Sequence, residues 1–169
     1  MKYAKIRKYD TSNGQGIRTT LFVSGCTHNC KGCFNKKAQN FNYGFNWDSK
    51  REEEFMTYVK DDKVVGVNIL GGEPMQQIKD NDLLRLLERI KKETGKSIWL
   101  WTGYTIEEIL INNNLIQLSM LSLVDVLIDG RFEEDKKDLK LKYRGSSNQR
   151  VIDVPASINK EEVVLLKID

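Results

Sequence analysis

Residues 17–33 read IRTTLFVSGCTHNCKGC, and this stretch decides how the chain is organised. Residues 17–24 are rich in β-branched and aromatic side chains, which predicts a strand that ends at Gly25. The loop that follows holds every cysteine of the chain, namely Cys26, Cys30 and Cys33. We therefore expect one strand to deliver three thiols to a single place.

Three clustered thiols favour an iron–sulfur cluster. Cys26, Cys30 and Cys33 could hold three corners of a [4Fe–4S] cubane and leave its fourth iron to a ligand that is not a cysteine. Structural zinc is an alternative, but it usually has four ligands, and His28, the only histidine, would have to complete the set. Inert buried thiols are a further alternative, whereas a disulfide framework fits poorly with an odd cysteine count. We expect His28 to be a loop residue near the site rather than a ligand.

Length and composition indicate an ordinary globular domain. The 169 residues are 40% hydrophobic and 30% charged, which predicts a single domain over residues 1-169. The net charge of +3 is too small to indicate nucleic-acid binding. No run of about 18 apolar residues predicts a membrane span, and nothing at the start resembles a secretory signal. Free thiols need a reducing compartment, so we expect a cytoplasmic protein with neither a nucleic-acid nor a membrane partner.

Strands and helices are predicted to alternate along the rest of the chain. The expected strands are residues 64–70, 97–102, 124–128, 151–154 and 163–168, and the expected helices begin after Asp48, at Asp80 or Asn81, at Thr105 and at residue 115. This alternation predicts βαβ units and an α/β fold with a parallel, mostly buried sheet. Because such crossovers are right-handed, the carboxyl ends of all the parallel strands should share one edge.

Four glycine-bearing motifs follow four successive predicted strands and should meet at that edge. They are the cysteine loop, GGEP at 71–74, TGY at 102–104 and DGR at 129–131. Each glycine could merely form a turn, but α/β folds place their ligand sites at this edge. Gly71 and Gly72 would let a ligand approach the backbone, and Glu73 offers a carboxylate to a cationic group.

The combination of C-x3-C-x2-C with GGEP resembles the radical S-adenosylmethionine superfamily. That resemblance implies a [4Fe–4S] cluster on Cys26, Cys30 and Cys33, with S-adenosyl-L-methionine chelating the fourth iron. It also implies that the segment Gly71, Gly72 and Glu73 contacts the amino group of this cofactor. One electron from the cluster would then cleave the sulfonium and give a 5′-deoxyadenosyl radical.

The third cysteine departs from the pattern of many superfamily members, which have an aromatic residue immediately before it. This chain has Gly32 there, and Phe34 follows Cys33 instead. The activating enzymes of anaerobic ribonucleotide reductases share this arrangement. By that resemblance, Gly32, Cys33 and Phe34 would line the adenine pocket.

The likeness to these activating enzymes extends along most of the chain. It rests on residues 16–26, 33–35, 100–104, 125–131 and above all 143–150 (YRGSSNQR). The family resemblance implies an incomplete TIM-like barrel of parallel βα units, open on one side. It implies a protein substrate, the catalytic subunit of an anaerobic ribonucleotide reductase, from which a glycine Cα hydrogen is abstracted. A flavodoxin-type or thioredoxin-linked reductant would supply the electron.

Two other functions remain as alternatives: a small radical S-adenosylmethionine enzyme that acts on a small molecule, and a non-catalytic module that holds metal or carries electrons.

Several side chains near the strand ends have two interpretations. Asp129 and Arg131 could lie near the cofactor, or could form an ion pair in an exposed turn. Thr102 could bond the cofactor, or could cap the turn before the next residue. Arg144 and Arg150 could tie their loop to the sheet or bind a partner.

Two further features are expected to be structural or to contact a partner. Trp99 and Trp101 lie two residues apart on one strand, so we expect them to pack together on one face. The charged run 132–142 is expected to be a solvated segment and is a candidate for partner contact.

Overall fold

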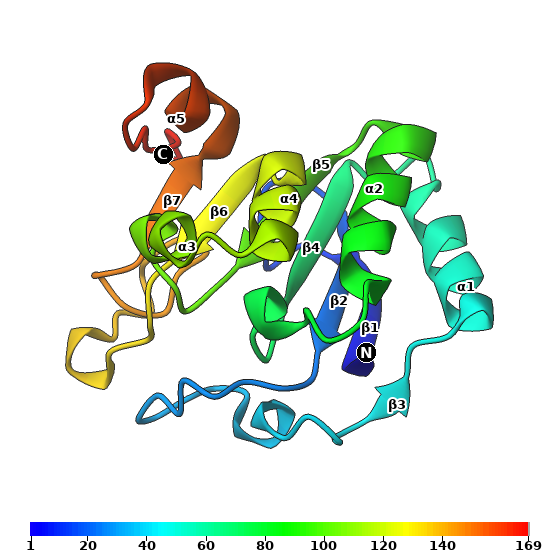
Figure 1. Cartoon of the computed structure of the whole chain (residues 1–169), viewed down its shortest axis with the longest axis horizontal. Helices are drawn as coiled ribbons and strands as arrows, with labels where there is room; N and C mark the ends of the chain where they lie inside the picture. Colours follow the sequence, from blue (N-terminus) through cyan, green and yellow to red (C-terminus); the bar gives the residue numbers. More distant parts are fainter. Residues whose placement is uncertain (169) are drawn as a thin grey trace.

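Seven strands form one mixed sheet in the computed structural model, which describes residues 1–168 (Figure 1). The order across the sheet is β3-β1-β2-β4-β5-β6-β7. The strands are β1 Lys2–Asp10, β2 Arg18–Val23, β3 Phe45–Asn46, β4 Gly66–Gly71, β5 Ser97–Trp101, β6 Val126–Asp129 and β7 Arg150–Asp153. The helices are α1 Ser49–Val59, α2 Asp82–Thr94, α3 Ile106–Asn112, α4 Leu115–Leu123 and α5 Val154–Lys160, with 3-10 turns η1 Lys36–Gln39, η2 Pro74–Gln76 and η3 Glu134–Lys136.

The centre of the sheet is parallel, as the strand–helix alternation predicted. Strands β2, β4, β5 and β6 pair in parallel, with Leu21 opposite Ile69 and Leu100 opposite Leu127. The two edges are antiparallel, because β1 pairs with β2, β3 with β1 and β7 with β6. The carboxyl ends of the four parallel strands therefore share one edge.

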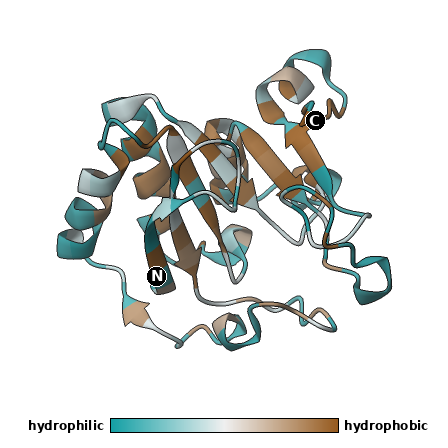
Figure 2. Cartoon of the chain, turned by 180° about the vertical axis from the view of Figure 1, so that it is seen from behind, coloured by the Kyte–Doolittle hydropathy of each residue, from teal (hydrophilic) through white to brown (hydrophobic). Residues whose placement is uncertain are grey.

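Side chains alternate across this sheet and give it two different faces. Ile98 and Leu100 of β5 belong to the main core beneath the helices, whereas Trp99 belongs to a smaller cluster on the other face. Figure 1 shows α2 and α4 in front of the sheet and α1 to its right, and Figure 2 shows the apolar central strands from the opposite side, with loops in front of them. Trp99 and Trp101 share the second face, with ring centroids 6.1 Å apart, as predicted.

Helix starts follow the predicted capping residues closely. The Asp48 carboxylate accepts a hydrogen bond from the backbone N–H of Arg51 at 2.8 Å and begins α1. Thr105 and Glu108 form the predicted capping box of α3, and Gly95 ends α2 with a φ of 65°. Helix α2 begins at Asp82, slightly later than predicted.

The terminal parts of the chain differ from the prediction. Strand β1 and helix α5 have no counterpart among the expected elements. The expected strand 163–168 is reduced to one bridge between Leu165 and Ile152, beside backbone hydrogen bonds such as Leu166 N–H to Val151 O at 2.9 Å.

The sheet remains open, since β3 and β7 are its two ends within residues 1–168. Whether its curvature is that of an incomplete TIM-like barrel stays a prediction, as does the single domain over 1-169. None of the helices among the described residues has the length and hydrophobicity needed to cross a membrane.

Candidate metal and cofactor site

A cavity of about 500 Å³ lies at the carboxyl ends of the parallel strands, on the face without helices. This volume is within the range of about 300–1,000 Å³ that is typical of ligand pockets. All the predicted site residues except Gly32 and Asp129 line it, namely Cys26, Cys30, Cys33, Phe34, Gly71, Gly72, Glu73 and Thr102. The fold thus brings the cysteine loop after β2 and the GGEP turn after β4 to one place.

The three cysteines supply soft sulfur donors to this cavity. All three are free and partly buried. Burial raises the pKa of the Cys26 thiol to about 11 and also raises the pKa of Cys30, so these thiols are protonated near neutral pH. A cluster that displaces these protons suits such a donor set. Within residues 1–168, no three histidine, cysteine or acidic side chains already have a metal-ligating arrangement.

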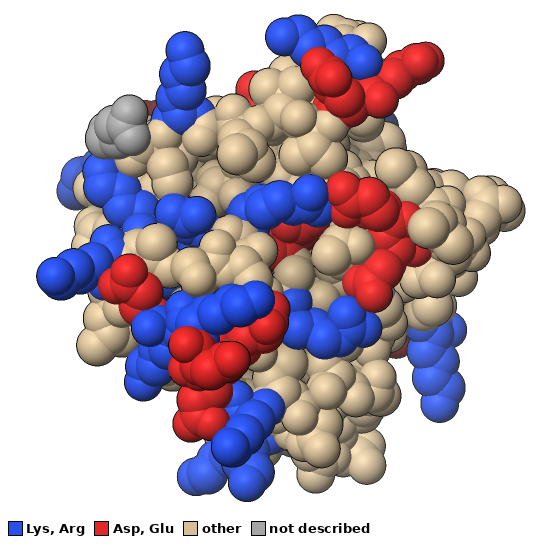
Figure 3. Space-filling view, turned by 90° about the vertical axis from the view of Figure 1, so that its left-hand side faces the viewer, with Lys and Arg blue, Asp and Glu red and all other residues tan. Residues whose placement is uncertain are grey.

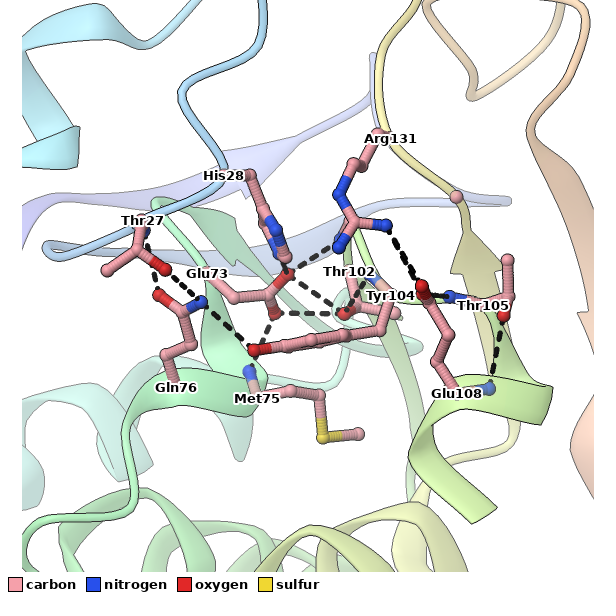
Figure 4. Close-up of polar contacts among 12 residues, drawn as sticks. Thr27, His28, Glu73, Met75, Gln76, Thr102, Tyr104, Thr105, Glu108 and Arg131 are labelled. Atoms are coloured by element: carbon pink, nitrogen blue, oxygen red, sulfur yellow. Dashed lines mark hydrogen bonds and ion pairs between the residues drawn. The ribbon is translucent and has the colours of Figure 1, made fainter. Parts of the chain in front are cut away.

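Glu73 is the most heavily bonded group beside the thiols (Figure 4). Its carboxylate is 1% exposed and accepts hydrogen bonds from His28 Nε2 at 2.7 Å and from Thr102 Oγ1 at 2.9 Å. The backbone N–H groups of Gly103 and Met75 add bonds of 2.6 and 2.8 Å. This buried acceptor is therefore held in one orientation by three consecutive loops.

Thr102 has the predicted capping role, while its bond to the cofactor stays a prediction. Its hydroxyl accepts a hydrogen bond from the backbone N–H of Tyr104 at 3.1 Å, which is the predicted turn cap. The same hydroxyl donates to Glu73, so within the protein it orients the carboxylate.

The glycines at the end of β4 are required by neighbouring backbone. Gly71 has a φ of +109°, and a Cβ there would lie 2.6 Å from the Val23 carbonyl oxygen. A Cβ on Gly72 would lie 2.7 Å from the carbonyl oxygen of Gly25. Gly71 and Gly72 both line the cavity, but the end of β2 occupies the space left by the missing side chain of Gly71, and the base of the cysteine loop occupies that of Gly72.

Gly32 and Phe34 connect the cysteine loop to the segment 132–149. Gly32 has a φ of +73°, and a Cβ there would lie 3.0 Å from Glu134 Oε1. The Phe34 ring is 59% exposed and lies 4.9 Å from the ring of Phe132, and the Lys137 ammonium lies 5.2 Å from the Phe34 ring centroid. The predicted solvated run 132–142 thus also forms part of the cavity wall, through residues such as Leu139.

Asp129 does not line the cysteine cavity. It is 1% exposed, and its carboxylate oxygens bind Arg150 Nε at 3.0 Å and Nη2 at 2.6 Å, with the backbone N–H of Ile106 at 2.9 Å. The alternative that Asp129 and Arg131 form an ion pair in an exposed turn is wrong, because Arg131 pairs with Glu108 at 3.2 Å. Buried Asp129 instead joins β6 to α3 and β7.

The remaining arginines also tie loops together. Arg150 binds Glu107 in addition to Asp129, which fits the first of its two possible roles, tying the loop to the sheet. Arg144 bonds carbonyls of its own loop, including Gln149 O at 3.4 Å, and lines the cavity. The face shown in Figure 3 carries basic and acidic side chains intermingled rather than in one patch of a single sign.

Sequence reasoning missed the polar side chains that brace this site. His28 was expected to be a loop residue near the site rather than a ligand, and its bond to Glu73 was not foreseen. Gln76 and Gln77 were not singled out, although both bond the cysteine loop, at Thr27 and Gly25 O respectively. Their position two and three residues after GGEP is the only signal that could have indicated this.

The arrangement of a three-thiol loop and a GGE turn on one cavity is typical of an iron–sulfur class of domain. A family model described as a 4Fe-4S single cluster domain matches residues 12–152. Three similar proteins are each named anaerobic ribonucleoside-triphosphate reductase-activating protein. That of Pasteurella multocida is 43% identical over 88% of this chain and 95% of its own length. That of Escherichia coli K12 is 40% identical over 89% and 97%, and that of phage T4 is 37% identical over 89% and 93%.

The chain therefore belongs to the family of anaerobic ribonucleoside-triphosphate reductase-activating proteins, which confirms the resemblance drawn from its motifs. The match to a cluster domain supports the [4Fe–4S] cluster over zinc. The comparisons give no support to a small-molecule radical enzyme or to a non-catalytic metal module.

Proposed function

We propose that this protein activates an anaerobic ribonucleoside-triphosphate reductase by placing a radical on a glycine of that enzyme. The observation that carries the proposal is the meeting of Cys26, Cys30, Cys33 and Glu73 on one cavity in a chain of this family. A [4Fe–4S] cluster held by these cysteines would supply, in its reduced form, the electron for reductive cleavage of S-adenosylmethionine, and the resulting 5′-deoxyadenosyl radical would take a Cα hydrogen from the glycine.

The residues of this chain have three tasks in that reaction. Cys26, Cys30 and Cys33 hold the cluster, which requires the loop to draw the three sulfurs together. The buried Glu73 carboxylate would receive the ammonium of the cofactor methionine, because its orientation is already set by the hydrogen bonds it accepts. Phe34 and the wall around it would border the bound cofactor, in keeping with the adenine-pocket role that the family resemblance implies.

The open sheet supports a protein substrate. An incomplete TIM-like barrel, which we propose for this chain, leaves one side of the cavity accessible to an incoming loop. Glycine suits this reaction because it has no side chain to block the approach to its Cα. A flavodoxin-type protein is the reductant we propose.

Anaerobic incubation with S-adenosylmethionine, dithionite and the reductase tests the proposal. We expect an electron-spin-resonance doublet from a carbon radical on the reductase and formation of 5′-deoxyadenosine. Cys30→Ala should give neither, while an otherwise folded protein remains. Cofactor cleavage without a reductase radical would point to a small-molecule substrate, and metal binding without cleavage would point to a non-catalytic module.

A further inference from the structure

Gln76, the last residue of η2, joins three loops through one amide (Figure 4). Its Oε1 accepts a hydrogen bond from the backbone N–H of Thr27 at 2.9 Å. Its Nε2 donates to Thr27 Oγ1 at 2.7 Å and to Tyr104 Oη at 3.0 Å. The Gln76 side chain, from the turn after β4, therefore forms hydrogen bonds with both the cysteine loop and the turn after β5.

The cysteine loop has few other attachments in this region. Its base is held by Gly25 N–H to Ala38 O at 2.7 Å and by Cys26 N–H to Gln39 O at 3.0 Å. Beyond that base, residues 27–32 have only a local backbone–backbone hydrogen bond within the described chain, from Cys33 N–H to Cys30 O at 3.2 Å, and none to a segment outside the cysteine loop. Side chains must therefore fix this stretch, and those of Gln76 and Glu73 do so.

The two attachments act on neighbouring residues and are themselves linked. Thr27 is bound to Gln76 and His28 to Glu73, so both residues after the first thiol are held. The His28 ring also packs edge-on against Tyr104, with centroids 4.7 Å apart, and Tyr104 accepts the second Gln76 bond. Displacing Thr27 would thus shift Cys26 relative to the Glu73 carboxylate.

We propose that Gln76 is a positioning residue that holds the cysteine loop in a fixed place relative to Glu73, so that the cluster site and the cofactor site face each other. The inference rests on the proposed function for its consequence, but its structural part is independent of it. Without the amide, the loop still contains all its thiols, so a cluster should assemble but be held less firmly. S-adenosylmethionine should then bind more weakly, because its two anchoring points are no longer fixed relative to each other.

Amide hydrogen exchange on the metal-free protein tests the structural part. Gln76→Ala should speed exchange of the Thr27 amide about tenfold relative to wild type, as expected for loss of a neutral hydrogen bond. Gln15→Ala, at an exposed position outside the site, is the matched control and should leave that amide unchanged. Equal exchange in wild type and Gln76→Ala would overturn the proposal, whether or not the protein activates a reductase.

The consequence is tested on the anaerobically reconstituted protein. Gln76→Ala should lose iron to a chelator and release S-adenosylmethionine about tenfold more readily than the Gln15→Ala control, by the same hydrogen-bond loss. Gln76→Glu keeps the acceptor for the Thr27 amide but loses the donor, so it should be intermediate.

A second pair of variants protects the test against misfolding of Gln76→Ala. Thr27 lies at an exposed loop position, and Thr27→Val removes the hydrogen bond between Gln76 Nε2 and the Thr27 hydroxyl. Combining it with Gln76→Ala should add nothing to the effect of Gln76→Ala alone. Fully additive effects, or an iron-release rate equal to that of the control, would overturn the proposal. If the wild-type protein held no cluster, the proposed function would fail. The hydrogen-exchange result would still show whether Gln76 positions the cysteine loop.

Discussion

Removing the guanidinium of Arg150 should leave a buried carboxylate unpaired. Asp129 is 1% exposed, and Arg150 contacts both of its oxygens, at 3.0 and 2.6 Å. Loss of one partner from a buried ion pair costs about 3–5 kcal/mol. The Arg150 side chain is 32% exposed, and the Ile106 N–H remains on Asp129, so we discount this to about 2–3 kcal/mol for Arg150→Met.

Thermal unfolding of the metal-free protein measures this loss. For a chain of this size, we expect the Tm of Arg150→Met to fall by about 4–12 °C. The control is Arg131→Met, whose guanidinium pairs with the partly exposed Glu108 and should contribute less than about 1 kcal/mol. Adding Asp129→Asn to Arg150→Met should recover part of the lost stability. Equal Tm values for the two single variants would refute the reasoning and return Asp129 to consideration as a cofactor ligand.

Three further substitutions have defined expectations. Glu73→Gln should weaken S-adenosylmethionine binding to the reconstituted protein by at least about tenfold in calorimetry, because the cofactor ammonium loses its carboxylate partner; unchanged affinity would exclude that contact. Burial alone would raise the pKa of Asp10, but hydrogen bonds from neighbouring side chains hold this pKa below its usual value. The ionised Asp10 carboxylate therefore stabilises the fold fully above the unfolded-state pKa of about 3.9, and this stabilisation is lost as the pH falls through the lower folded-state pKa. The free energy of urea unfolding of Asp10→Asn should therefore depend less on pH below about pH 4 than that of the wild type. An unaltered pH profile would contradict this. Gly71→Ala should lower the free energy of unfolding by more than about 2 kcal/mol, and Gly95→Ala by about 1 kcal/mol. Both glycines have a positive φ, but only at Gly71 would the added Cβ also collide with neighbouring backbone atoms. Similar unfolding midpoints for the two variants would show that the steric contact is unimportant.

The parallel centre of the fold was predictable because its signals are local. Strand β4 is an apolar run that ends at glycines, and the capping box at Thr105 marks the start of α3. Strand β1 was not predicted, since its sequence KYAKIRKYD mixes charges with apolar residues and it forms by antiparallel pairing with β2. Such pairing depends on a distant partner that no local pattern identifies.

In the candidate site, too, features with a local sequence signal could be predicted, whereas contacts between distant residues could not. Cysteine spacing and the position of GGEP after a strand indicated the residues that line the cavity. The partners of buried groups could not be derived this way, as Asp129 pairs with Arg150 rather than with nearby Arg131. A contact between residues far apart in the chain is fixed by the way β6, β7 and α3 pack, and only the folded structure contains that information.

The indole of Trp101 gives the cavity an intrinsic optical reporter. It borders the same cavity as the thiols, and its Nε1–H donates to the carbonyl oxygen of Tyr143 at 2.7 Å. A chromophore bound there would accept excitation energy from this ring, whereas Trp47 lies in the main core under the opposite face. Emission quenching, compared between wild type and Trp101→Phe, would therefore follow loading of the site and movement of the segment around Tyr143 without any attached dye.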